Sequence, residues 1–524
     1  MIRQLQSGQG TQRSLPCDVA IVGAGLAGLI MACELSRRGL RTIVLESGAL
    51  SQDTDTSPLN RVIQTGHTYQ GAEHGRFRCL GGTSTRWGGA LLPFLEDDLC
   101  ADTTPGRSEA WPVRLAELEP FLPAVERLFS LPAGSYEPPS AVALPAGAAF
   151  RAREAKWPAF GRRNVARLLE KKLRAPAGPE VWLNAHVTRL RLAENGRLST
   201  LEASDPSGVS VVVSPKVAVL AAGTIESTRL LLKLDADHDR RLFAAPAIVG
   251  RYFHDHLSAP VAAVRVLDRK RFNRTVGFRF AGSGMRNLRF ELTGSERRRR
   301  GLPGAFAHVA FSAGDGSGFE ALRQIYRAAQ RGRPPPRAEL ARLARNSGWL
   351  ARAAWSRWAE RRVLPPDRAR FEVHLVTEQI PRASNRITLS EHESDPYGVP
   401  LAQIHWQVSA DDVANTVRVG DAFARFWADS ALARLGELEF AAPDILAQAL
   451  RRGGGIYHPG GSLRMSAARR SGVVDAGLRT FAVPNLRVVS TATFPSGGAA
   501  NPTMMLILLA LRASADVARE LGRD

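Results

Sequence analysis

The chain has 524 residues, and its formal net charge is +20. This length suggests about two or three domains of roughly 100–200 residues each, or one large domain with an insertion. Hydrophobic residues make up 44% of the chain and charged residues 23%, which excludes a wholly disordered or fibrous protein. Cys17, Cys33, Cys79 and Cys100 form no CxxC pair, so a zinc site or disulfide framework is not expected and a reducing compartment fits.

The positive charge is concentrated in one segment. Residues 297–370 contain 17 Arg and 5 acidic residues, a net charge of +12. No nucleic-acid recognition motif accompanies this charge, so nucleic acid is not the expected partner. The first residues carry no apolar signal region, and the apolar runs are too short or too glycine-rich to span a membrane. We therefore expect a cytoplasmic protein, with membrane association left open.

The first predicted elements form one unit, in which a strand, a glycine turn, a helix and a second strand are followed by an acidic residue. A β-branched run at 18–22 predicts a buried parallel strand, and a helical pattern follows to Gly39. Between them lie Gly23, Gly25 and Gly28, and a second strand at 41–45 ends at Glu46.

This unit predicts a dinucleotide site. The first glycine makes the tight turn, the second lets the backbone approach a pyrophosphate, and the third lets helix and strand pack closely. The phosphates are expected at the helix N-terminus, and Glu46 is expected to accept hydrogen bonds from ribose hydroxyls. A glutamate there disfavours a 2′-phosphate, and the motif fits NAD or FAD.

The later elements continue an α/β pattern and add a second sheet. A strand at 216–223 leads into a helix from Thr224, and residues 371–407 have the pattern of an antiparallel sheet. Residues 320–362 are helical and rich in arginine, with Pro334, Pro335 and Pro336 between two halves. A helix at 410–432, a short strand at 486–490 and a helix at 503–521 complete the prediction.

Two further motifs have the composition of ligand-binding loops. Residues 81–89 (GGTSTRWGG) can lay backbone N–H groups and an aromatic edge against a cofactor, although an ordinary turn explains them equally well. Residues 457–465 (YHPGGSLRM) place His458 beside a glycine run. Asn501, Pro502 and Thr503 suit the start of a helix, where an N-cap amide can also face a ligand.

These motifs resemble the glucose–methanol–choline (GMC) family of FAD-dependent oxidoreductases. Matching blocks occur in the family's order at 23–28, 81–89, 219–231, 249–256 and 458–503, and residues 378–390 resemble its substrate-domain strands. The resemblance implies an α/β plus α+β protein, with a Rossmann-like FAD-binding domain interleaved with an antiparallel-sheet substrate domain. The implied domains are 14–260 and 450–524 for FAD and 261–449 for substrate, with an Arg-rich helical insertion at 297–362.

The resemblance also implies the cofactor residues. Gly23, Gly25, Gly28 and Glu46 would hold the ADP half of FAD, and Val187 would contact adenine through its backbone. Around the rest of the cofactor the implied residues are Gly82, Thr83, Ser84, Trp87, Gly88, Ala222, Gly223, Pro502 and Thr503. Arg86 stands where some members carry a histidine that bonds FAD covalently, so non-covalent FAD is expected.

The implied reaction is oxidation of a hydroxyl carbon to a carbonyl. His458 would remove the hydroxyl proton, the hydride would go to flavin N5, and Asn501, 43 residues later, would orient the substrate oxygen. His254 and His256 are expected to be structural or to support the catalytic pair, and no metal is expected. The helix at Asn501 would stabilise negative charge on reduced flavin.

The resemblance leaves the substrate and the electron acceptor open. A sugar, glycoside or other polyhydroxylated metabolite is the expected substrate, and oxygen, a quinone or a protein would reoxidise FAD. One alternative is a simple or hydrophobic alcohol oxidised at a membrane surface with a quinone, because Trp349, Trp355 and Trp358 lie among arginines. The other alternative is a non-redox lyase on the same fold.

Overall fold

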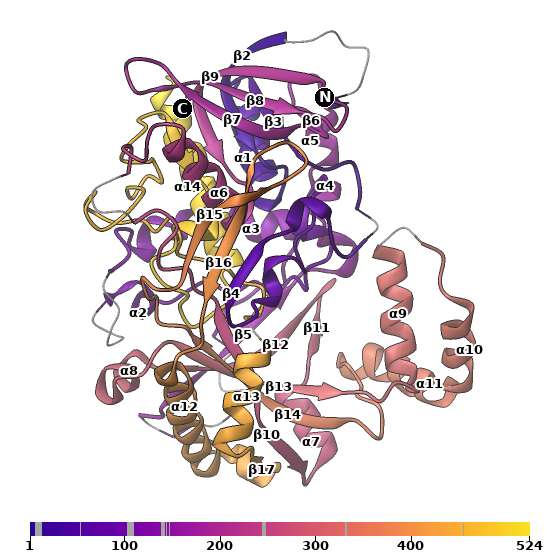
Figure 1. The fold of residues 1–524 in the computed structure, drawn as a ribbon. Coiled ribbons are helices and arrows are strands. Elements are labelled where there is room, and N and C mark those ends of the chain that lie inside the picture. Colours follow the sequence, from indigo (N-terminus) through magenta and orange to yellow (C-terminus); the bar gives the residue numbers. More distant parts are fainter. Residues whose placement is uncertain are drawn as a thin grey trace.

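A computed structural model shows two large sheets (Figure 1). Residues of both sheets line one cavity. It describes residues 1–5, 13–52, 54–101, 109–137, 142, 144–145, 147–243, 248–330, 333–453 and 455–523. No helix in these ranges is long and apolar enough to cross a membrane.

The first sheet has eight strands and carries the glycine turn. Its order is β1 (Ile2–Gln4), β6 (Glu180–Leu183), β3 (Thr42–Leu45), β2 (Arg13–Val22), β9 (Ser210–Leu220), β8 (Leu198–Ser204) and β7 (His186–Leu192), and β18 (Leu486–Val488) also pairs with β9. The central pairs are parallel, and β7 and β8 are antiparallel additions. β3 is buried along its whole length, as a parallel strand covered on both faces must be.

Three helices begin near the ends of these strands. They are α1 (Leu26–Arg37), α6 (Gly223–Ala236) and α14 (Thr503–Glu520). α1 packs against α14, so the last segment of the chain completes the layer that the first segment begins.

The second sheet is antiparallel and has seven strands. Its order is β11 (Arg279–Ala281), β12 (Gly284–Leu292), β13 (Ala305–Ser312), β14 (Arg370–Glu378), β10 (His256–Val266) and β17 (Gly436–Phe440), and β5 (Phe150–Trp157) pairs with β12. The helices α12 (Ala410–Asp429) and α13 (Pro443–Gly453) cover one face. Phe423 and Phe426 of α12 pack there against Phe150 and Phe290 of the sheet.

The sheets correct three predicted boundaries. β5 lies in the second sheet although it falls within 14–260, and β1 lies in the first sheet although it precedes residue 14. The segment 371–407 divides between sheets: β14 joins the seven-stranded sheet, whereas β15 (Arg386–Ser394) and β16 (Pro400–Trp406) form a three-stranded sheet with β4 (Ile63–Gly66). Alternating apolar residues predict a strand but do not identify its partner, which explains the error.

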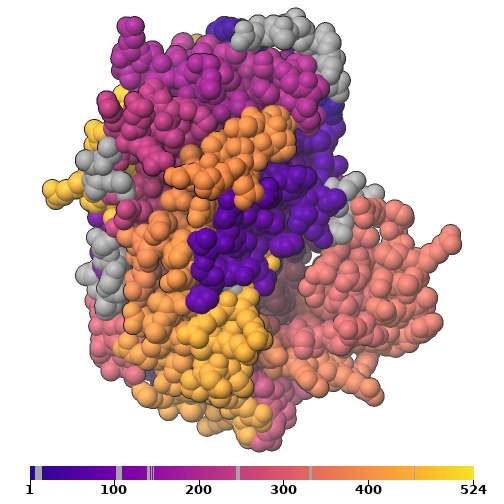
Figure 2. All heavy atoms as spheres, in the orientation of Figure 1, coloured from indigo at the N-terminus to yellow at the C-terminus, as the bar shows by residue number. Residues whose placement is uncertain are grey.

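The predicted insertion at 297–362 is also too wide. It includes β13, a central strand of the second sheet. The helical part consists of α9 (Gly318–Gln330), α10 (Arg337–Arg345), α11 (Ser347–Trp355) and one π-helical turn at Ser356–Glu360. These helices, here called the helical arm (residues 318–360), stand out from the side of the molecule (Figures 1 and 2).

The remaining helices are short. They are α2 (Glu96–Leu99), α3 (Leu122–Phe129), α4 (Val165–Leu168), α5 (Glu170–Arg174), α7 (Arg269–Val276) and α8 (Gly294–Arg300).

Candidate active site

A cavity of about 1240 Å³ runs from the glycine turn of the first sheet to a wall formed by the second sheet. Fifteen of the sixteen predicted site residues line it: Gly23, Gly25, Glu46, Gly82, Thr83, Ser84, Trp87, Gly88, Val187, Ala222, Gly223, His458, Asn501, Pro502 and Thr503. Gly28 does not line the cavity, because it lies inside the contact between α1 and β2. The sequence motifs therefore converge on one space.

The glycine turn has the geometry that its spacing predicts. Gly23 has a φ of +103°, which disfavours any residue with a side chain. A Cβ on Gly28 would lie 2.0 Å from the carbonyl oxygen of Gly23, whereas a Cβ on Gly25 would meet nothing within 4 Å. Gly28 thus allows close packing, and Gly25 leaves open space above the backbone.

Glu46 closes the turn from the end of β3. Its Oε2 accepts a hydrogen bond of 2.8 Å from the Ala24 N–H, and its Oε1 accepts one of 2.9 Å from the Gly48 N–H. Burial raises the pKa of Glu46, and these two hydrogen bonds act in the opposite direction. Oε1 also accepts from the Ser47 hydroxyl at 3.4 Å, so Oε2 is the oxygen whose second lone pair can accept from a ligand hydroxyl.

The helices α1, α6 and α14 all present their N-termini to the cavity. Their N-cap residues are Gly25, Ala222 and Pro502, and none of these supplies a side-chain hydrogen bond to the helix. The first N–H groups of a helix need acceptors, and together they favour an anion. Uncapped helix starts, open space above Gly25 and the size of the cavity fit a dinucleotide with a pyrophosphate.

The loop at 81–89 lies against the glycine turn. A Cβ on Gly82 would lie 2.9 Å from the Cα of Gly25, so the two glycine loops touch backbone to backbone. Ser84 accepts from the Val165 N–H at 3.1 Å, and the Trp87 indole donates to the Arg163 carbonyl at 2.8 Å. These bonds fix the loop along one side of the cavity.

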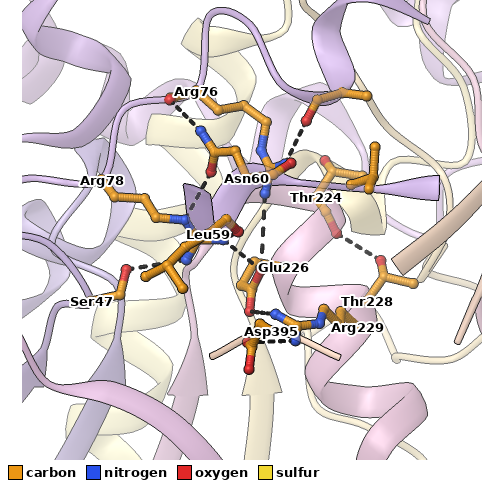
Figure 3. A network of polar contacts seen from close by, with 12 residues as sticks. Ser47, Leu59, Asn60, Arg76, Arg78, Thr224, Glu226, Thr228, Arg229 and Asp395 are labelled. Atoms are coloured by element: carbon orange, nitrogen blue, oxygen red, sulfur yellow. Dashed lines mark hydrogen bonds and ion pairs between the residues drawn. The ribbon is translucent and has the colours of Figure 1, made fainter. Parts of the chain in front are cut away.

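A network of charged side chains supports the start of α6 (Figure 3). Glu226 accepts from Arg78 at 2.8 Å and from Arg229 at 3.1 Å, and Arg229 also donates to Asp395 at 2.7 Å. Burial alone would raise the pKa of Glu226, but the arginines hold it well below its usual value. A buried charge cluster with all partners present ties α6 to the loop before residue 81 and to the β15–β16 hairpin.

His458 and Asn501 meet beside the start of α14. The Asn501 Nδ2 and the His458 Nε2 are 3.2 Å apart, so the amide donates and the imidazole accepts. Burial lowers the pKa of His458 well below 6.5, and His256 and Arg289 lower it further. The imidazole is therefore neutral at neutral pH, and its Nε2 can accept a proton.

Asp255 holds the main chain of His458. Both of its carboxylate oxygens accept from the His458 N–H at 3.0 Å, and Oδ2 also accepts from the Tyr69 hydroxyl at 2.6 Å. The His256 N–H donates to Oδ1 at 2.6 Å, and the His256 ring meets the His458 ring edge-on, with centroids 5.3 Å apart. Burial raises the pKa of Asp255 to about 7 against these hydrogen bonds.

The same cluster could offer donor atoms to a metal ion. One ligand atom each from Asp255, His256 and His458 lies within 4.8 Å of the others. Asp255 already accepts hydrogen bonds on both oxygens, and His256 Nε2 lies 3.0 Å from the Gly498 carbonyl. The donors are thus engaged within the protein, and the absence of a metal stays a prediction.

Arg289 reaches the His458–Asn501 pair from the second sheet. It is the sixth residue of β12, and its Nη1 donates to the Asn501 Oδ1. This bond fixes the orientation of the amide, so that Nδ2 points at His458. The sequence analysis did not identify Arg289, because arginine alternation in a strand usually indicates a solvent-exposed face.

Known families match two stretches of the chain. Residues 18–273 match the family described as FAD dependent oxidoreductase, and residues 381–510 match the family described as GMC oxidoreductase. The chain therefore carries a GMC oxidoreductase C-terminal domain and an FAD-dependent oxidoreductase domain. The two matches include every predicted site residue, and the helical arm lies between them.

Individual relatives of this chain are distant. The 2-methyl-1,2-propanediol dehydrogenase of Mycolicibacterium austroafricanum is 24% identical over 66% of this chain, and the match spans 55% of that protein. The fructose dehydrogenase large subunit of Gluconobacter japonicus is 23% identical, over 98% of this chain and 99% of that protein. The crystal structure of pyridoxine 4-oxidase from Mesorbium loti superposes with a TM-score of 0.57 at 18% identity, covering 95% of this chain and 99% of that one.

Proposed function

We propose that this protein oxidises a CH–OH group of a small hydroxylated molecule to a carbonyl, with FAD as the electron acceptor. The observation that carries the proposal is the pair formed by His458 Nε2 and Asn501 Nδ2, which share one hydrogen bond at the cavity wall. A substrate hydroxyl inserted between these atoms would give its proton to Nε2 and accept from Nδ2.

FAD fits the remainder of the cavity. The glycine turn, Glu46 and the α1 N-terminus would hold the ADP half, and the 81–89 loop and the α14 N-terminus would hold the flavin. When bound, FAD supplies the acceptor for the hydride, which is the proton and two electrons that leave the carbinol carbon.

His458 accepts the other proton. As the C–H bond breaks, the hydroxyl oxygen forms the second bond of the carbonyl and its proton moves to Nε2. An imidazole whose pKa lies well below 6.5 is ready to accept at neutral pH, but it is a weak base. Proton transfer is therefore favoured only when it accompanies hydride loss, or when a nearby positive charge stabilises the alkoxide.

Polyols and sugars are the proposed substrates. The relatives named above act on a diol and on fructose according to their names, and the cavity wall offers polar side chains such as Ser258 and His374 to further hydroxyls. A lyase is the competing reaction, because it could use the same base without electron transfer.

We propose that FAD is bound without a covalent bond. Arg86 occupies the position from which some family members attach the flavin, and its Nη2 donates to the Gln52 carbonyl at 3.0 Å. Arginine has no nucleophilic nitrogen at neutral pH. Acid precipitation should release all yellow colour into the supernatant, and flavin retained in the pellet would contradict this proposal.

The helical arm supports a second proposal, contact with an anionic membrane surface. Trp355 and Trp358 are 63% and 77% exposed, and their ring centroids lie 5.7 Å apart. Exposed tryptophans among arginines suit the interface of a membrane. Wild-type protein should sediment with anionic vesicles, and a variant with Trp355→Ser and Trp358→Ser should not. Equal sedimentation of the two would refute this contact.

The deciding experiment for the proposed function is an anaerobic absorbance scan of the FAD-loaded protein against alcohols, polyols and sugars. The proposal would be supported if one compound bleaches the oxidised flavin band of the wild type. The same compound should leave the band unchanged in His458→Ala that has its full flavin content. Turnover of a substrate to fragments without flavin bleaching would establish a lyase. A protein that binds no FAD would overturn the assignment of the cavity.

A further inference from the structure

Arg289 is a buried cation that forms no ion pair with a described residue. Seven arginines are buried in the described part of the chain, and six of them pair with a carboxylate: Arg153, Arg229, Arg286, Arg297, Arg464 and Arg487. Arg289, 5% exposed, has no carboxylate within ion-pair distance among the described residues. Its Nε also has no hydrogen-bond partner among them.

The nearest carboxylate is shared with a second arginine. Glu291 lies two residues along the same strand, and its Oε2 accepts from Arg153 at 2.7 Å. Burial lowers the pKa of Arg289 to about 10 and the charge of Glu291 acts in the opposite direction, so the guanidinium remains charged at neutral pH. A buried charge without an ion pair is costly, and such a charge at a cavity wall points to a ligand that pairs with it.

The surroundings of Arg289 suit an anion. The second sheet and α9 contribute ten residues to the cavity, and none of these is acidic. Phe306 lies beneath the guanidinium at 4.4 Å from its ring centroid, and His308 and His374 lie farther along the same wall. Arg327 adds a second positive charge to the cavity from α9.

The position of Arg289 sets where the anion must lie. Its Nη1 bonds to Asn501 Oδ1, and Asn501 Nδ2 bonds to His458 Nε2. A group on Arg289 is therefore one side chain away from the hydroxyl that His458 and Asn501 would hold. The carboxylate and the hydroxyl of a 2-hydroxy acid are on neighbouring carbons, so adjacent binding groups suit it, and a guanidinium matches a planar carboxylate with two parallel hydrogen bonds.

We propose that Arg289 binds the carboxylate of a 2-hydroxy acid, such as a sugar-derived acid, and so determines which hydroxyl is oxidised. This inference rests on the proposed function. The substrate R–CH(OH)–COO⁻ loses its hydroxyl proton to His458 and a hydride to FAD, and leaves as the 2-oxo acid R–CO–COO⁻. The carboxylate stays on Arg289 throughout, and its charge is unchanged.

The first test measures binding without turnover. The probe is 2-hydroxy-2-methylpropanoate, which carries the hydroxyl and carboxylate but has no C–H bond to lose as hydride. Calorimetric titration of the FAD-loaded wild type should give a dissociation constant that rises about 30-fold or more in Arg289→Met, less in Arg289→Lys, and less than about threefold in the control Arg323→Met, an arginine of α9 that pairs with Glu320 outside the cavity. The neutral amide of the probe should bind wild type and Arg289→Met equally.

The stability of Arg289→Met separates binding from a structural role. Because the arginine is buried without an ion pair, an apolar side chain of similar length should leave the melting temperature unchanged or raise it. Lost probe binding together with a lowered melting temperature and lost flavin would mean that Arg289 holds the fold, and would overturn the inference.

The second test measures oxidation under anaerobic conditions. Wild type should be reduced by 2-hydroxy acids far faster than by the matching neutral polyols, and Arg289→Met should lose this preference through KM. If the wild type were reduced faster by a phosphorylated polyol than by a 2-hydroxy acid, Arg289 would be a phosphate site and the proposed carboxylate site would be wrong. Reduction by neutral sugars with no effect of Arg289→Met would refute the inference and leave the proposed function intact. Arg289-dependent probe binding without flavin reduction by any compound would refute the proposed function alone.

Discussion

The hydroxyl of Tyr69 controls the charge of the carboxylate that holds His458. Tyr69 is fully buried, and its hydroxyl donates to Asp255 Oδ2 at 2.6 Å. Burial and the neighbouring Asp255 raise the pKa of Tyr69 well above 10, so the hydroxyl remains a donor across the working range of pH. Tyr69→Phe removes this one donor and leaves the ring in its place against Phe253.

The size of the effect follows from the kind of bond lost. A hydrogen bond to a charged group contributes about 1.5–3 kcal/mol, and it acts here on the ionised form of Asp255. At 1.36 kcal/mol per pKa unit, the pKa of Asp255 should rise from about 7 by about one to two units. The free energy of unfolding should fall by about 1.5–3 kcal/mol at pH 9, where the wild-type carboxylate is ionised, and by less at pH 5.

Asp255 also sets the sign of its contribution to the pH dependence of wild-type stability. The folded state keeps a proton on Asp255 up to about pH 7, whereas the unfolded chain releases it near 3.8. Asp255 therefore contributes stability that is fully present below pH 3.8 and is lost as the pH rises through 7. Activity should follow the opposite course, because the ionised carboxylate is the better acceptor for the His458 N–H.

The assay is the pH dependence of kcat/KM, with Tyr326→Phe as the matched control. Tyr326 is 48% exposed on α9, far along the chain from Asp255. We expect an acidic limb near pH 7 in wild type and the control, and a limb displaced upward by about one to two units in Tyr69→Phe. An unchanged limb in Tyr69→Phe, with normal flavin content, would refute the link between Asp255 and catalysis.

Three further substitutions test the cofactor turn, the catalytic pair and the second sheet. Gly28→Ala places a Cβ 2.0 Å from the Gly23 carbonyl oxygen, so we expect loss of FAD, measured as the ratio of flavin to protein absorbance. In the control variant Gly420→Ala, in α12, the added Cβ meets nothing within 4 Å, so this variant should retain FAD. Asn501→Ala should keep its flavin but lower kcat/KM by about 10²–10³ in steady-state kinetics, and a loss under tenfold would contradict its role. Arg153→Met leaves Glu291 buried without its partner, so denaturant titration should show a loss of about 3–5 kcal/mol, and a loss below 1 kcal/mol would be unexpected.

The cofactor half of the site could be predicted from the sequence because its chemistry is local. Gly23, Gly25 and Gly28 lie within one turn: Gly23 has a positive φ, Gly28 leaves no room for a Cβ, and Gly25 leaves open space above the backbone. The short strands on either side have a simple apolar pattern and pair with parallel neighbours, so their arrangement follows from the motif. Glu46 could be predicted from its distance along the chain from the turn alone.

The substrate half could not be predicted in this way, because contacts between distant segments create it. Asp255 binds residues at 69 and 458, and β12 brings Arg289 to Asn501 across 212 positions of sequence. Strand alternation places a side chain on one face or the other, but it does not say which face meets a cavity. The error in dividing the sheets at residue 260 has the same origin.

Asn501 connects the two halves of the site, and its two amide atoms serve different groups. Its Nδ2 donates toward the base, and its Oδ1 accepts from the guanidinium of Arg289. A histidine at this position could accept from Arg289 only by directing its other nitrogen at His458, and two imidazoles would then compete for one proton. The pairing of an amide with a buried arginine therefore suits a substrate that brings its own negative charge, because the arginine stays positioned and the base stays neutral before the anion arrives.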